Sequence, residues 1–206
     1  MPDMTAPYLV GYDIRFDPAA ASLSWTAERR RQFLLREDVA HPLSVDPTAW
    51  PSRFWQLHVP PGMGVPRHVG TAAVPPDTPG FTPLGLWTDL ERLRAFARTV
   101  HVPAAPVLAV LAWTGDALLH AFASGEPAPG EGWRSLGFDV ADASFVSGLT
   151  NCGFGGERAA LMLEWAPRLN AHGLLASLDD AFAFRDLTDA RVPEHAPFLV
   201  FELRTR

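Results

Sequence analysis

The sequence predicts a soluble globular protein of the α+β class, with helices packed on a mixed or mostly antiparallel sheet of about five strands. Hydrophobic residues make up 48% of the chain and charged residues 19%, which is typical of folded rather than disordered proteins. Apolar residues alternate in some segments and follow helical spacing in others. The two kinds of segment do not alternate strictly along the chain, which argues against a doubly wound parallel sheet.

The length of 206 residues fits a single domain, which at this size buries roughly 70% of the surface of its unfolded chain. We therefore expect residues 1–206 to form one globular domain. Residues 60–83 hold seven prolines and four glycines. A loop of that length is uncommon in a compact domain and is often functional or mobile. The alternative is a linker between two halves.

The N-terminal part is expected to hold two strands and one helix. Residues 8–16 alternate between two sets of side chains, as in a half-buried strand that ends at Asp17-Pro18. Thr26 is a plausible N-cap for a surface helix over residues 26–36. Residues 54–59 alternate again and predict a short strand.

Residues 88–99 predict a helix, because Thr88 and Glu91 have the spacing of a capping box. Residues 106–113 are interpreted as a buried strand that precedes a short helix over residues 116–123. The alternative for both segments is one buried helix broken at Gly115.

The C-terminal third is expected to hold two strands and two helices. Alternation predicts a strand at residues 136–141, and residues 198–203 are expected to form the final strand. The first helix begins near residue 157, is kinked or broken by Pro167 and ends at His172-Gly173. Ser177 and Asp180 form a capping box for the second, which runs to about residue 189 with Phe182 as its apolar anchor.

Composition excludes several function classes. All 17 basic residues are arginine, so Schiff-base chemistry and a P-loop lysine are impossible. The net charge of −6 argues against a nucleic-acid partner. The run Arg29-Arg30-Arg31 is interpreted as the solvated side of a helix.

We expect a cytoplasmic protein with no membrane partner. The single cysteine cannot form an internal disulfide, which fits a reducing compartment. The N-terminus lacks the pattern of a signal peptide, and the longest apolar run, residues 104–113, is far too short to span a membrane. The sequence leaves the oligomeric state open and indicates no cofactor.

The first candidate site is the stretch 136–157, which contains Asn151 and the only cysteine, Cys152, shortly before an expected helix. A helix N-terminus can lower the pKa of a thiol, and the nearby glycines could let backbone N–H groups approach an anion. Cys152 would then be a nucleophile with a distant histidine as its base, and Asn151 would help to bind the ligand. The alternative is that Cys152 is a small buried hydrophobic residue and the glycines permit turns.

The second candidate pair is Asp139 and Asp142, near the end of the strand at 136–141. Carboxylates at strand ends are common in active sites, and they are equally common as caps of loop turns. Asp13, in the first strand, would form an acid pair with Asp139 if the two strands were neighbours.

Arg67 and His68 are candidate binding residues in the long loop, where they could meet an anionic ligand or a partner. The alternative is that they are two polar residues on an exposed loop. The chain has no HxH, HExxH or Cys-His spacing, so no metal site is expected. Seven tryptophans are many for this length, and an exposed tryptophan often marks an interaction surface.

Two functions follow from these observations. The first is a binding protein that recognises another protein and regulates or inhibits it, as the acidic charge, the aromatic residues and the long loop suggest. The alternative is a small hydrolase or transferase that uses Cys152 with a histidine, or Asp139 and Asp142 as acid and base. No signature of a nucleotide-binding fold, a hydrolase elbow, a kinase or a deaminase is present.

Overall fold

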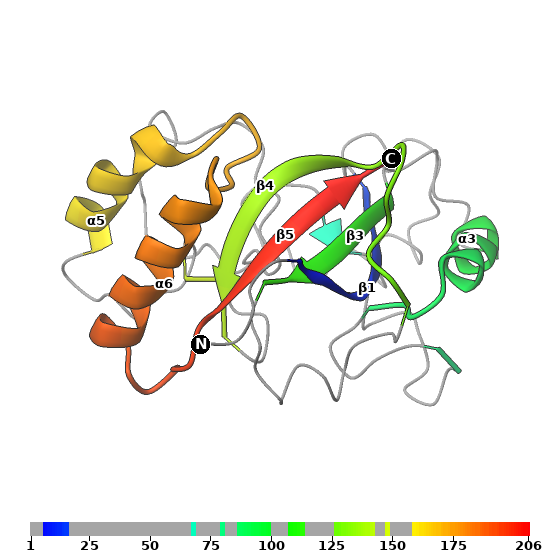
Figure 1. Ribbon diagram of the computed structural model, residues 1–206, viewed down its shortest axis with the longest axis horizontal. Coiled ribbons are helices and arrows are strands. Elements are labelled where there is room, and N and C mark those ends of the chain that lie inside the picture. Colours follow the sequence, from blue (N-terminus) through cyan, green and yellow to red (C-terminus); the bar gives the residue numbers. More distant parts are fainter. Residues whose placement is uncertain are drawn as a thin grey trace, which may run out of the picture.

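The protein folds as an antiparallel sheet with helices packed on it, which confirms the α+β class (Figure 1). The helices expected at residues 26–36 and 116–123 and the strand expected at 54–59 lie outside the described residues. The computed structural model describes residues 6–16, 67–68, 79–80, 86–99, 107–113, 126–142, 147–148 and 158–206.

Within the described residues, the sheet has four strands of six to nine residues rather than about five: β1 (Tyr8–Phe16), β3 (Val107–Ala112), β4 (Arg134–Ala141) and β5 (Leu199–Thr205). The two-residue β2 (Arg67–His68) adds to one edge. The order is β2-β1-β3-β5-β4, and every neighbouring pair is antiparallel. The C-terminal strand β5 therefore lies in the interior of the sheet.

Helix α3 (Leu90–Thr99) begins one residue later than the start that a capping box of Thr88 and Glu91 would give. Its first turn is capped by Asp89, whose Oδ1 accepts a hydrogen bond from the Arg92 N–H at 2.9 Å. Thr88 instead donates its hydroxyl to the Gly80 carbonyl at 3.2 Å. The prediction was wrong by one residue because Thr88 is used to anchor the preceding turn, and aspartate is an equally good N-cap.

The C-terminal helices follow the expected local signals in most respects. Helix α5 (Arg158–Trp165) stops before Pro167 and continues as the short helix η3 (Ala166–Arg168), so the expected end at His172-Gly173 was wrong. Helix α6 (Leu178–Arg191) begins at the expected cap, where the Ser177 hydroxyl accepts from the Asp180 N–H at 3.1 Å. Its buried aromatic residue is Phe184 rather than Phe182.

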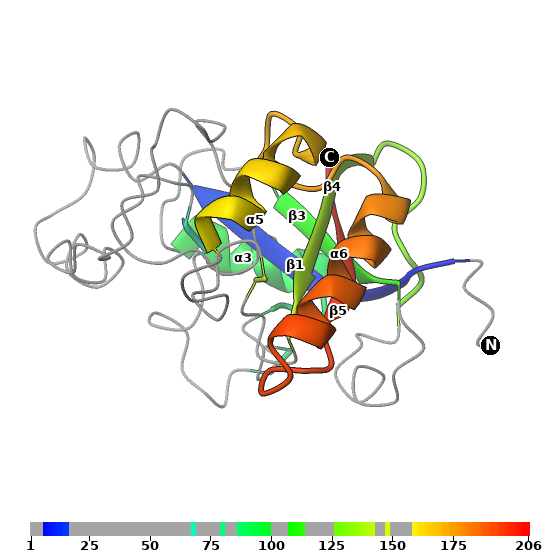
Figure 2. The ribbon, with the colours of Figure 1, turned by 90° about the vertical axis from the view of Figure 1, so that its left-hand side faces the viewer.

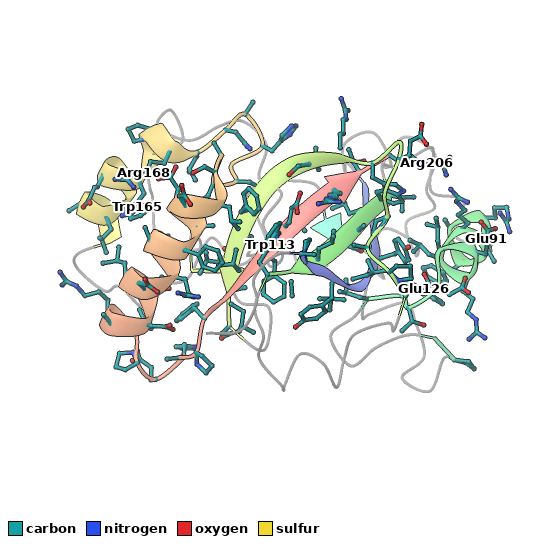
Figure 3. The ribbon with its side chains drawn as sticks, in the orientation of Figure 1. Glu91, Trp113, Glu126, Trp165, Arg168 and Arg206 are labelled. Carbon is teal, nitrogen blue, oxygen red and sulfur yellow. The ribbon has the colours of Figure 1, made fainter. Side chains whose placement is uncertain are left out.

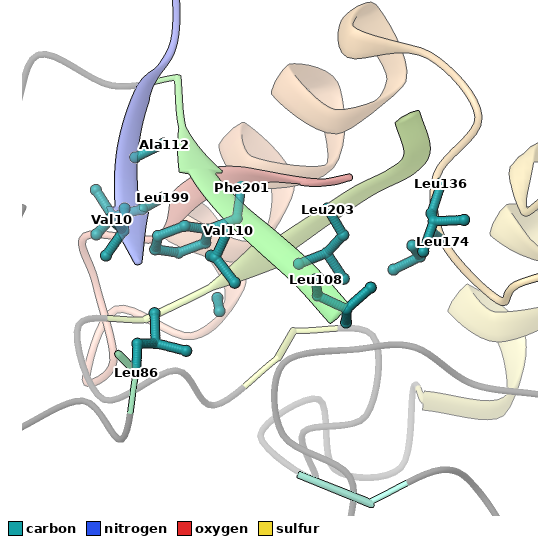
Figure 4. Close-up of a cluster of buried hydrophobic side chains, with 11 residues drawn as sticks. Val10, Leu86, Leu108, Val110, Ala112, Leu136, Leu174, Leu199, Phe201 and Leu203 are labelled. Atoms are coloured by element: carbon teal, nitrogen blue, oxygen red, sulfur yellow. The ribbon is translucent and has the colours of Figure 1, made fainter. Parts of the chain in front are cut away.

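The two faces of the sheet bury different hydrophobic clusters. Figure 4 shows the cluster on one face, to which β3 and β5 contribute alternate residues such as Val110 and Phe201. The opposite face carries two clusters: α3 covers Leu9 and Leu111, and α6 covers Val140 and Val200 with Phe184. In Figures 1 and 2, α3 therefore lies at the β1 end of the sheet, and α5 and α6 lie at the β4 end.

Loop residues cover the outer edge of β4, which would otherwise offer unpaired backbone groups to another strand. Asn170 is central to this cover, since its side-chain amide donates to the Leu136 carbonyl at 2.7 Å and its oxygen accepts from the His172 N–H at 2.9 Å. Further along the edge, Phe138 exchanges two backbone hydrogen bonds with Leu175, and the Gly148 N–H donates to the Val140 carbonyl. None of the helices in these parts of the chain has the length and apolar character needed to cross a membrane.

Candidate functional site

Asp139 is completely buried on β4. Its Oδ1 accepts a hydrogen bond from the Ser147 hydroxyl at 2.6 Å and another from the Val140 N–H at 2.9 Å. A buried carboxylate is tolerated only when such donors compensate its lost hydration. These bonds attach Ser147, which is also fully buried, to the end of β4. Asp139 therefore holds Ser147 in place beside the edge strand.

Asp142, just after β4, lies beside a histidine that is 53 residues away in sequence. The Nδ1 of His195 is 3.1 Å from Oδ2 of Asp142. The Asp142 side chain is 9% exposed, whereas the His195 side chain is 40% exposed. The His195 N–H donates to the Val192 carbonyl, which fixes the turn between α6 and β5.

This pair has the geometry of an acid–base dyad. When Nδ1 carries the proton and donates it to Asp142, Nε2 is the basic nitrogen of the His195 ring. A carboxylate that holds an imidazole in this tautomer also stabilises the imidazolium that forms when the ring accepts a proton. The arrangement is therefore able to take a proton from a hydroxyl, a thiol or a water molecule.

The other expected site residues are not brought to this pair within the described part of the chain. Asp13 and Asp139 lie on β1 and β4, which are separated by β3 and β5, so the idea that they form an acid pair was wrong. Cys152 and Asn151 lie outside the described residues. Arg67 and His68 form β2, far along the sheet from β4.

A second arrangement of polar and aromatic groups lies at the β1 end of the sheet. The Trp133 ring is tilted by 43° against the ring of the buried Tyr12, with 5.9 Å between centroids. The Tyr12 hydroxyl donates to Oε2 of the exposed Glu126 over a long 3.5 Å. We call Tyr12, Glu126 and Trp133 the Trp133 surface.

Two carboxylates and one guanidinium of the described residues act on the Tyr12 hydroxyl. The pKa of Tyr12 is raised above its usual 10.0, first by burial of the phenol and then by the charge and hydrogen bond of Glu126. Asp89 raises this pKa further, and Arg94 lowers it. The two carboxylates outweigh the one guanidinium at the Tyr12 hydroxyl.

A buried ion pair fixes the backbone that carries the Trp133 surface. Both carboxylate oxygens of Glu202, on β5, accept hydrogen bonds from Arg204, at 2.9 and 3.0 Å. The indole N–H of Trp113 donates to Oε2 of Glu202 at 3.0 Å. Arg204 also donates to the carbonyl of Pro129 at 3.2 Å, which ties the chain between Glu126 and Trp133 to the sheet.

Sequence reasoning missed most of these partners. Glu202 did carry a signal, because it lies between Phe201 and Leu203 at the end of an apolar run, and a carboxylate at such a position needs a buried partner. Nothing in the sequence relates His195 to Asp142, because the two residues are 53 positions apart. Residues 126–132 hold two prolines and two glycines, which indicates a turn but no partner for Glu126.

In the described ranges, no three or more side chains of His, Cys, Asp and Glu gather closely enough to hold a metal ion. No protein-family model, curated protein or solved structure matches the chain. The proposals below therefore rest on the geometry of the described residues.

Proposed function

We propose that this chain is a binding protein that recognises another protein through the Trp133 surface and regulates or inhibits it. The observation that carries the proposal is a half-buried tryptophan, Trp133, that packs on the buried Tyr12 ring beside the exposed carboxylate of Glu126. Tryptophan and tyrosine dominate the energetics of protein interfaces, where an aromatic centre is surrounded by a polar rim. A cytoplasmic location is part of this proposal, since the single cysteine fits a reducing compartment.

The rigid support of Trp133 favours binding. The turn that precedes it is closed by a hydrogen bond from the Trp133 N–H to the Gly130 carbonyl at 3.3 Å. Arg204 holds the same segment at Pro129. An aromatic side chain that is already ordered loses little conformational freedom on binding, so more of its contact energy contributes to affinity.

Photo-crosslinking tests the surface. A benzoylphenylalanine in place of Trp133 should crosslink to a protein in a lysate of the source cells, whereas the same residue in place of Ala183, exposed on α6, should not. Trp133→Ala should abolish co-purification of the crosslinked protein under conditions in which circular dichroism shows the variant to be folded, because loss of a ring that packs on Tyr12 lowers the urea midpoint. Equal crosslinking at both positions, or capture that survives Trp133→Ala, would refute this use of the surface.

The Asp142–His195 dyad supports a second candidate function, a small hydrolase or transferase. Its carrying observation is the 3.1 Å contact between a nearly buried carboxylate and an imidazole with substantial exposure. In one form of this proposal, His195 is the base for the nucleophile Cys152. In the other, Asp142 acts through His195 on a bound substrate or water molecule.

Alkylation of Cys152 tests the thiol form. The rate with iodoacetamide should be measured against pH in the folded wild type, in His195→Gln and in Asp142→Asn. Reaction near pH 6 in the wild type, lost in both variants, would support His195 as the base. A thiol that stays inert until denaturation, or that reacts alike in all three proteins, would eliminate this role.

A further inference from the structure

Arg168 provides an example, within this protein, of how a guanidinium is bound. The guanidinium carbon of Arg168 lies 4.3 Å from the ring centroid of Trp165 (Figure 3), and its NH1 is 2.9 Å from Oδ1 of Asp180. The cation therefore contacts an aromatic face and a carboxylate at once. A planar guanidinium suits this arrangement because its face can lie on an aromatic ring while its N–H groups donate within the plane of the guanidinium.

The Trp133 surface presents the same two partners. Trp133 supplies an aromatic ring and Glu126 supplies an exposed carboxylate, and both are connected through Tyr12. Among the described residues, no guanidinium stacks on the Trp133 ring as Arg168 does on Trp165. The aromatic and anionic parts of a guanidinium site are thus present on one surface.

The charges around this surface favour a cation. Asp89 and Glu126 both raise the pKa of Tyr12, so their negative potential reaches its hydroxyl. The opposing Arg94 is engaged by Glu91 at 2.6 Å. Among the charges that the structure describes around Tyr12, the carboxylates therefore dominate next to an aromatic ring, which favours an incoming positive charge.

We propose that the protein bound at the Trp133 surface presents an arginine, whose guanidinium stacks on Trp133 and donates to Glu126. This inference rests on the proposed binding function and names the chemistry of its partner. The ion pair of Glu202 with Arg204 contributes by positioning the segment that carries both groups, through the bond from Arg204 to Pro129. Arg204 is thus a positioning residue for the surface and does not itself contact the partner.

A peptide titration tests the inference. The probes are three capped tripeptides of the form Ala-X-Ala, in which X is arginine, lysine or citrulline; citrulline keeps the shape of arginine but carries no charge. Binding is followed by NMR through the indole N–H signal of Trp133, assigned with Trp133→Phe. The arginine peptide should bind roughly threefold to tenfold more tightly than the citrulline peptide, with lysine between them.

Two matched variants separate the site from general electrostatics. Glu126→Gln should weaken binding of the arginine peptide by roughly threefold to tenfold. Glu164→Gln removes the same charge from an exposed position on α5 and should leave the affinity unchanged. Urea midpoints of both variants should match the wild type, so that a loss of binding is not a loss of folding.

The outcomes distinguish this inference from the function on which it rests. If the arginine and citrulline peptides bind equally, or if Glu164→Gln weakens binding as much as Glu126→Gln, the guanidinium site is wrong. Crosslinking at position 133 would in that case still support a binding protein with a different partner chemistry. If Trp133 neither responds to a peptide nor crosslinks to a protein, both proposals fail.

Discussion

Replacing Arg204 with methionine is expected to destabilise the protein by about 3 kcal/mol. Glu202 is 5% exposed and accepts two hydrogen bonds from Arg204 and one from Trp113. Methionine keeps an unbranched apolar stem but removes two of these donors, so a carboxylate stays buried with too few partners. Breaking a buried ion pair from one side costs about 3–5 kcal/mol.

The lower end of that range applies because the Arg204 side chain is 23% exposed, so water reaches part of the ion pair and weakens it. The Pro129 carbonyl also loses its donor. In a protein of this size, a loss of about 3 kcal/mol corresponds to a fall of roughly 6–12 °C in Tm.

Urea denaturation of Arg204→Met, Glu202→Gln and the double variant measures the effect as a double-mutant cycle. The double variant should be more stable than the sum of the single losses predicts, by at least about 1.5 kcal/mol. Arg206→Met is the control, because Arg206 is exposed at the chain end, and it should change stability by less than about 0.5 kcal/mol. A cost below about 1 kcal/mol for Arg204→Met, or strictly additive losses, would refute the argument.

Three further predictions concern Gly137, Asn170 and Tyr12. Gly137→Ala should destabilise the protein by at least about 2 kcal/mol, because the residue has a φ of 128° and a Cβ there would lie 2.5 Å from the Asn170 amide nitrogen; Gly130→Ala, with open space around it, should be close to neutral. Asn170→Ala should cost about 2–3 kcal/mol in urea denaturation, since it removes the bonds that cover the edge of β4. By ultraviolet absorbance, Tyr12 should titrate above pH 10.0, and Glu126→Gln should lower that pKa.

The sign of the Tyr12 effect on stability follows from its raised pKa. The folded state keeps the phenol protonated at pH values where the unfolded chain has lost the proton. The contribution is therefore complete below pH 10 and is lost as the pH rises through the folded pKa. Tyr12→Phe should remove this part of the alkaline loss of stability, and an unchanged profile would contradict it.

For the two edge substitutions, a Gly137→Ala protein as stable as Gly130→Ala, or an Asn170→Ala loss below about 1 kcal/mol, would be the contrary result.

Local chemistry made several elements predictable from the sequence. The alternation of side chains located β1 and β4, because a half-buried strand needs apolar residues at every second position. The length and valines of residues 106–113 favoured a buried strand over a buried helix, and β3 confirms the strand. The strand expected at residues 198–203 is confirmed as β5. Ser177 located the start of α6 and Pro167 the break that follows α5, because a cap and a missing N–H act within one helical turn. Asp142 was also named as a candidate, from its position at a strand end.

Only the tertiary structure decided which side chains meet. The pairs Asp142–His195, Trp113–Glu202 and Tyr12–Glu126 are 53, 89 and 114 residues apart. Each contact depends on how strands and loops are placed around the sheet, and the side-chain pattern of a strand defines its two faces but not its neighbours. For the same reason Asp13 and Asp139 could be assigned to strands from the sequence, whereas their separation by β3 and β5 could not.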